Sequence, residues 1–120
     1  MSKKILVVDD EPATRKLVSE LLKKQQYEVI TANDGLDALN SIKKNHPDLV
    51  VLDIMMPEMN GYDVCYELRF NKQFEQLPII LLTKRSKELD DSIGKRVNIE
   101  YMSKPINTKL LLEKIESLLK

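Results

Sequence analysis

The sequence has little of several residue types, and each shortage excludes a class of protein. A single cysteine, Cys65, rules out an internal disulfide. With only three glycines, the chain contains neither the Gly-x-x-x-x-Gly-Lys loop nor the Gly-x-Gly-x-x-Gly turn of nucleotide enzymes. No apolar run approaches the length that spans a membrane, and the Met-Ser-Lys-Lys start leads into a strand pattern rather than a signal peptide. We therefore expect a cytoplasmic globular protein.

The chain also lacks net charge, because nineteen basic residues balance nineteen acidic ones. This balance gives no net attraction to a nucleic-acid backbone or to an anionic membrane. We expect no direct nucleic-acid binding by this chain and no membrane association. At 120 residues the chain can bury one hydrophobic core. We expect one domain over residues 1–120, which is either a complete protein or one domain of a longer one.

Two residues with reactive side chains have ordinary structural explanations. Cys65 lies in a helix-like stretch, where a small buried side chain is its expected role. His46, the only histidine, precedes Pro47 at a predicted helix-to-strand turn. We therefore expect His46 to be an exposed loop residue, and neither a metal ligand nor a phosphorylated histidine.

Short β-branched apolar runs alternate with helical segments along the chain. The runs are Ile5 to Val8, Val29 to Ala32, Leu49 to Leu52, Ile79 to Leu82 and a weaker one near Tyr101. Three of the segments between them have an apolar helical face, formed by Leu17, Val18, Leu21 and Leu22, by Leu36, Leu39 and Ile42, and by Leu111, Ile115, Leu118 and Leu119. The alternation predicts an α/β fold, with a five-stranded parallel sheet covered by helices on both faces.

The fourth helical segment, from Lys87 to Val97, has a weaker pattern. Leu89, Ile93 and Val97 recur at four-residue spacing, but Gly94 interrupts them. A glycine costs roughly 1 kcal/mol relative to alanine in a helix interior. We expect this helix to be the least stable of the five.

Residues that can carry chemistry follow the ends of the predicted strands. In open α/β sheets, ligands bind beyond the carboxyl ends of the strands. Asp9, Asp10 and Glu11 follow the first strand, Asp53 the third, Thr83 the fourth, and Ser103, Lys104 and Pro105 the fifth. Each of these alone could be an ordinary turn residue, but their joint placement favours a site.

Clustered carboxylates repel one another unless a cation offsets their charge. Magnesium suits such a cluster, and Asp10 and Asp53 are the expected direct ligands, with Asp9 acting through water. A carboxylate beside this metal can attack phosphorus and form an aspartyl phosphate. Lys104 would neutralise charge on the transferring group, and Thr83 would donate its hydroxyl to a phosphoryl oxygen.

At this point the motifs resemble a known family, the receiver domain of two-component response regulators, over essentially the whole chain. The matching segments are Leu6 to Pro12, Asp53 to Gly61, Leu81 to Thr83 and Tyr101 to Pro105. The resemblance implies a flavodoxin-like (βα)5 three-layer sandwich with strand order 2-1-3-4-5. It also implies a phosphorylation-activated signalling protein rather than an enzyme, although the receiver assists its own phosphorylation and dephosphorylation.

The resemblance also implies a role for each site residue. Asp9 and Asp10 are the acidic pair, Asp53 is the phosphoacceptor, the Met55 carbonyl is a metal ligand, Thr83 is the signalling hydroxyl, Lys104 is the invariant lysine, and Tyr101 is the aromatic that swings inward on phosphorylation. The Lys104–Pro105 peptide is expected to be cis and to direct Lys104 toward Asp53. The implied partners are a sensor histidine kinase or histidine phosphotransfer protein, and a downstream effector or fused output domain. The expected state is a monomer or a phosphorylation-dependent dimer.

Two departures from the family pattern and two alternative functions remain. Lys84 stands where the family usually has a small residue, and we hypothesise that it alters the lifetime of the phosphoryl group. The segment Val97 to Glu100 replaces the usual Gly-Ala. A haloacid-dehalogenase-type phosphohydrolase is disfavoured, because that family needs an aspartate at the position of Met55. The serious alternative is a receiver-fold interaction module that is not phosphorylated.

Overall fold

The computed structural model describes residues 2–83 and 99–120. Five strands lie in these ranges: β1 (Lys4–Val8), β2 (Glu28–Ala32), β3 (Leu49–Asp53), β4 (Ile79–Thr83) and β5 (Ile99–Ser103). The helices in the same ranges are α1 (Pro12–Lys24), α2 (Gly35–Asn45), α3 (Gly61–Arg69) and α5 (Thr108–Leu118). The predicted fourth helix from Lys87 to Val97, with Gly94, lies outside the described residues, as do Lys84 and Asn98.

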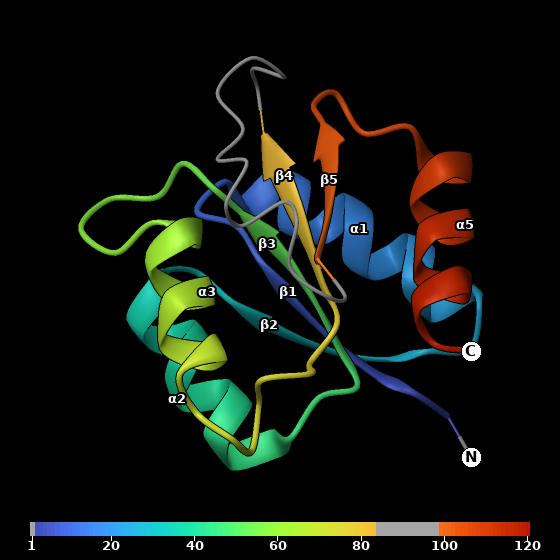
Figure 1. The fold of residues 1–120 in the computed structure, drawn as a ribbon. Helices are drawn as coiled ribbons and strands as arrows, with labels where there is room; N and C mark the ends of the chain where they lie inside the picture. Colours follow the sequence, from blue (N-terminus) through green and yellow to red (C-terminus); the bar gives the residue numbers. More distant parts are fainter. Residues whose placement is uncertain (1, 84–98) are drawn as a thin grey trace.

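The strands form one parallel sheet in the order β2-β1-β3-β4-β5, which confirms the flavodoxin-like fold. Helices α2 and α3 cover one face of this sheet, and α1 and α5 cover the other (Figure 1). All five residues of β3 and of β4 are buried, as expected for central strands covered on both sides.

Alternate residues of each strand enter two separate cores. Leu6, Val50 and Leu81 pack with the helices on the α2/α3 face, whereas Ile5 and Leu82 pack with α1 and α5. This division follows from the two-residue period of a strand. Because side chains on both faces of the sheet are buried, the strands are held in position. The polar residues follow at their carboxyl ends.

The predicted helical faces are mostly correct, with two errors. Val18 and Leu22 of α1 are buried, but Leu17 is 51% exposed. In α2, Leu36 is 62% exposed, because the buried face begins one residue earlier, at Gly35, and continues through Ala38, Leu39 and Ile42. Each helical residue is rotated by about 100° from its neighbour, so a shift of one position moves a side chain off the sheet.

Of the helices in the described ranges, α2, α3 and α5 begin with side-chain caps that lie at the carboxyl end of the sheet. Asn60 and Asp63 form a reciprocal capping box at α3, and Asp34 and Asn107 cap α2 and α5. Helix α1 differs, since Pro12 starts it and its N-cap residue, Glu11, makes no side-chain capping bond. None of the helices in the two described ranges is long and apolar enough to cross a membrane.

Candidate functional site

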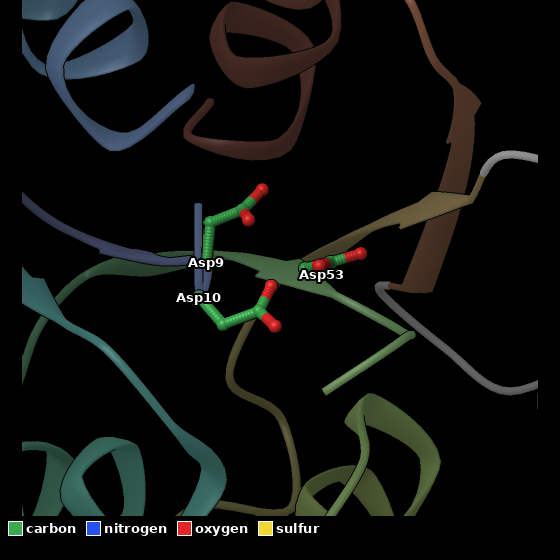
Figure 2. A group of neighbouring side chains, drawn as sticks. All are labelled: Asp9, Asp10 and Asp53. Atoms are coloured by element: carbon green, nitrogen blue, oxygen red, sulfur yellow. The ribbon is translucent and has the colours of Figure 1, made fainter. Parts of the chain in front are cut away.

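Three carboxylates meet where β1 and β3 end. Asp9 and Asp10 directly follow β1, and Asp53 is the last residue of β3, which pairs with β1. Figure 2 shows the three side chains together, and one carboxylate oxygen from each lies within 4.8 Å of the others. Asp9 and Asp53 are buried, at 0% and 2% exposure, whereas Asp10 is exposed. The parallel pairing of the two strands thus produces the acidic cluster that the sequence predicts.

The ammonium group of Lys104 lies beside this cluster. Its Nζ is 2.9 Å from Oδ2 of Asp9, 3.1 Å from Oε1 of Glu11 and 3.6 Å from Oδ2 of Asp53. The backbone N–H of Lys104 donates to the carbonyl of Thr83, and the Lys104–Pro105 peptide is cis. The loop after β5 therefore brings a cation, only 9% exposed along its side chain, to two buried carboxylates.

The environment of Asp53 raises its pKa to about 6. Burial is the largest cause, because it disfavours the charged form, and the negative charge of Asp9 adds to it. The Lys104 charge and a hydrogen bond donated by the Met55 N–H, at 3.3 Å, offset part of this effect. Burial by itself lowers the pKa of Lys104, but the hydrogen bond to Asp9 and the charge of Asp53 outweigh it and raise that pKa.

The residues present fit a hard divalent cation. Asp9, Asp10 and Asp53 supply only oxygen donors, one from each within 4.8 Å of the others, and these three carboxylates outnumber the single Lys104 ammonium beside them. Magnesium takes oxygen ligands and commonly uses one or two carboxylates. Met55 is next to this cluster through its amide contact with Asp53, while its side chain is 59% exposed. Its backbone is thus the part that faces the site.

Thr83 and Tyr101 lie on neighbouring strands near the cluster. Thr83 ends β4 and is buried, and β4 pairs with β3 so that Leu82 is level with Asp53. Tyr101 of β5 is half-buried and packs against the core on the α2/α3 face. The fold therefore places Thr83 at the end of the strand beside β3, while the roles of Thr83 and Tyr101 stay predictions.

Cys65 and His46 have the structural roles that the sequence predicts. Cys65 is 1% exposed on α3, and burial raises the pKa of its thiol to about 12. His46 is exposed at the end of α2, where its φ of 48° is in the left-handed region that ends a helix. Its ring contacts the Phe74 ring, with centroids 5.7 Å apart.

Sequence reasoning missed two contributors to the site. The sequence places Glu11 as an acid after the first strand but predicts no role for it, although its side chain contacts Lys104. Gly61 is only the last residue of a family-matching segment in the sequence, but an added Cβ there would be 2.7 Å from the carbonyl oxygen of Asp53. Only a residue without a side chain allows α3 to start this close to the Asp53 backbone. The presence of a glycine at this position is the sequence feature that indicates such a close approach.

This chain is similar to proteins of one known family. Residues 5–116 match the family described as the response regulator receiver domain. The chain is 39% identical over 121 residues to the alkaline phosphatase synthesis transcriptional regulatory protein PhoP of Bacillus subtilis, covering 100% of this chain and 50% of that protein. It is 44% identical over 119 residues to a probable transcriptional regulator, ycf27, of Cyanophora paradoxa, covering 98% and 48%. The chain thus spans about half the length of these curated relatives.

Solved structures agree with these relatives. The chemotaxis protein CheY4 of Vibrio cholerae is 33% identical, with a TM-score of 0.89 over 99% of this chain and 100% of that one. The response regulator TrrA of Thermotoga maritima, solved in complex with Mg²⁺ and BeF, is 41% identical, with a TM-score of 0.87 over 98% and 99%. With its family match, fold and acidic cluster, this chain belongs to the receiver domains of response regulators, which act in two-component signalling.

Proposed function

We propose that this receiver domain stores a signal as a phosphoryl group on Asp53. The observation that carries the proposal is the arrangement at the strand ends: a buried carboxylate with two further aspartates around it and the Lys104 ammonium 3.6 Å away. A nucleophile, a place for a cation and a fixed positive charge thus lie together at the strand ends. This set is what phosphoryl transfer to a carboxylate needs.

In the proposed reaction, a carboxylate oxygen of Asp53 attacks the phosphorus of a phosphohistidine on a partner kinase or phosphotransfer protein. The new P–O bond forms as the P–N bond breaks, and the histidine nitrogen keeps the bonding electron pair and takes a proton. Hydrolysis by water later returns inorganic phosphate and the free carboxylate. The raised pKa of Asp53 still leaves it ionised, and therefore nucleophilic, at neutral pH.

Magnesium would be held by Asp10, Asp53 and the Met55 carbonyl, with Asp9 acting through water, and it supplies charge neutralisation for the phosphoryl oxygens. Lys104 provides the same kind of stabilisation from the protein side, by hydrogen bonds to a phosphoryl oxygen. Asp9 keeps Lys104 in place through the 2.9 Å contact. The buried setting of Asp9 and Asp53 limits water around the reacting atoms.

The phosphoryl group would add about −1.5 to −2 charges at neutral pH, and Thr83 would donate its hydroxyl to it. We propose that this contact lets Tyr101 move inward and changes the surface on β5 and α5. The relatives of about twice the length are named as transcriptional regulators, which supports a fused or separate effector as the output partner. The receiver is then a signalling phosphoacceptor rather than a metabolic enzyme.

Intact-mass spectrometry after incubation with acetyl phosphate tests the proposal. Wild type should gain the mass of one phosphoryl group with Mg²⁺ and none in EDTA. The Asp53→Asn variant should gain none in either condition, whereas Asp37→Asn, which removes an exposed carboxylate at the start of α2, should behave as wild type. No gain by wild type from acetyl phosphate or from a phosphohistidine donor would instead favour a phosphorylation-independent interaction module.

A further inference from the structure

The side chain of Glu11 is not used to cap its own helix. Glu11 is the N-cap residue of α1, yet its carboxylate makes no capping hydrogen bond. Pro12 and the backbone bond from the Arg15 N–H to the Glu11 carbonyl start the helix instead. The carboxylate turns to Lys104, 3.1 Å away. Its position therefore serves the phosphorylation site rather than the helix.

The ammonium group of Lys104 has three N–H donors, and the closest carboxylates are not the phosphoacceptor. Asp9 and Glu11 lie at hydrogen-bond distances of 2.9 and 3.1 Å, whereas Asp53 is farther, at 3.6 Å. These two contacts engage two of the three donors and hold the ammonium beyond hydrogen-bond distance of Asp53, so a move of Lys104 toward Asp53 lengthens at least one of them. The two contacts differ in what their loss costs.

Asp9 is fully buried, so leaving its charge without Lys104 would be costly. The Glu11 side chain is 49% exposed, so water can replace the ammonium there at little cost. Glu11 is thus the partner that Lys104 can release. While it is bound, it keeps Lys104 away from Asp53.

We propose that Glu11 is a positioning residue that competes with the phosphoryl group on Asp53 for Lys104. This inference rests on the proposed function, because the competitor is the phosphoryl group. In the resting protein, Glu11 sets the position of Lys104. During phosphorylation, Lys104 moves from Glu11 to a phosphoryl oxygen, and the strength of the Glu11 contact limits how readily it does so.

The test uses Glu11→Gln, which keeps the side-chain length but removes the charge. An exposed ion pair is worth little, so we expect a roughly two- to fivefold faster gain of phosphoryl mass from acetyl phosphate with Mg²⁺. Binding of beryllofluoride with Mg²⁺ should tighten by a similar factor. Glu58→Gln is the matched control, since Glu58 is exposed on the loop between β3 and α3. It should leave both quantities close to wild type.

A double-mutant cycle separates competition for Lys104 from a general effect of charge. In a Lys104→Met background, Glu11→Gln should no longer tighten beryllofluoride binding. An equal gain in that background, or an equal gain from Glu58→Gln, would overturn the inference. If wild type takes no phosphoryl group, the proposed function fails and the competition fails with it. If wild type is labelled but Glu11→Gln is no faster, only the competition fails.

A crystal structure of metal-free Glu11→Gln provides a readout that does not depend on phosphorylation. Without the Glu11 charge, the Lys104 ammonium should move within hydrogen-bond distance of Asp53 Oδ2, compared with the 3.6 Å of the parent chain. A loss of packing at the start of α1 would not produce this directed movement. An unmoved Lys104 would overturn the inference.

Discussion

At the scale of single residues, the burial of Asp53 disfavours the charged form of its side chain. Its folded-state pKa of about 6 lies above the ordinary value of 3.8, so the folded protein binds this proton more tightly than the unfolded chain does. Stability is therefore lost as pH rises from about 4 to about 6, and it stays reduced above that window. The folded protein thus holds a carboxylate whose charged form is destabilised. This is the carboxylate that we propose binds a cation and accepts a phosphoryl group.

We predict that Asp53→Asn raises the free energy of unfolding of the metal-free protein at pH 7.5 by roughly 1–3 kcal/mol, because it removes this buried charge. The advantage over wild type should shrink as pH falls toward about 4.5, where Asp53 itself becomes protonated. Urea unfolding in EDTA at both pH values measures it. Glu20→Gln, an exposed charge removed from α1, should change stability little at either pH. A variant no more stable than wild type at pH 7.5 would contradict the prediction.

The residues of the site could be predicted because the carboxyl ends of parallel strands meet at one edge. Asp9, Asp53 and Lys104 are far apart in sequence, yet topology alone brings them together. The Glu11 contact could not be predicted in the same way. It depends on the direction of one side chain at the start of α1, and no pattern in the sequence encodes that direction.

At the scale of elements, the close approach of α3 to β3 depends on Gly61. A Cβ at this position would lie 2.7 Å from the Asp53 carbonyl oxygen and 2.8 Å from the Ile54 Cα, and both contacts are with backbone. The Gly61 N–H also donates to the Ile54 carbonyl at 2.9 Å. The start of α3 is thus fixed against the segment that carries the phosphoacceptor.

We predict that Gly61→Ala lowers the free energy of unfolding by about 1–3 kcal/mol, because backbone must move to make room for the methyl group. It should also weaken Mg²⁺ binding, since the movement occurs at Asp53 and Ile54. Urea unfolding and Mg²⁺ titration measure the two effects. Thr108→Ala, in the first turn of α5 and exposed, is the control that should keep wild-type Mg²⁺ affinity. Unchanged stability in Gly61→Ala would show that the backbone adapts.

Within residues 2–83 and 99–120 the sequence predicts the strands and helices well, but it places two side chains on the wrong side of a helix. The apolar runs mark each strand to within about two residues of its observed bounds. The pattern predicts that Leu17 and Leu36 are buried, because they are apolar and lie at near-helical spacing, but both are exposed. The face that packs is decided by the angle at which each helix meets the sheet, and Gly35 and Ala38 fill it in α2.

At the scale of the whole molecule, balanced charge coexists with a local cluster of acidic side chains. Nineteen cations and nineteen anions cancel over the chain, but three aspartates lie within 4.8 Å at one end of the sheet. The composition of the chain therefore does not predict this acidic cluster. The strand order is likewise predicted only by the family resemblance. The alternation of strands and helices is compatible with several strand orders of a parallel sheet.

We predict that Mg²⁺ stabilises the entire fold, because the cluster of Asp9, Asp10, Asp53 and Lys104 forms only when β1, β3 and the loop after β5 are assembled. A ligand that binds only the folded state adds about 1.4 kcal/mol to the free energy of unfolding at roughly ten times its Kd. Urea unfolding with increasing MgCl₂, compared with NaCl at equal ionic strength, isolates the specific part. Asp53→Asn should gain much less, because it loses a proposed ligand. An equal gain in the variant would mean that magnesium acts on surface charge, since the only difference between the two proteins is the carboxylate at the centre of the cluster.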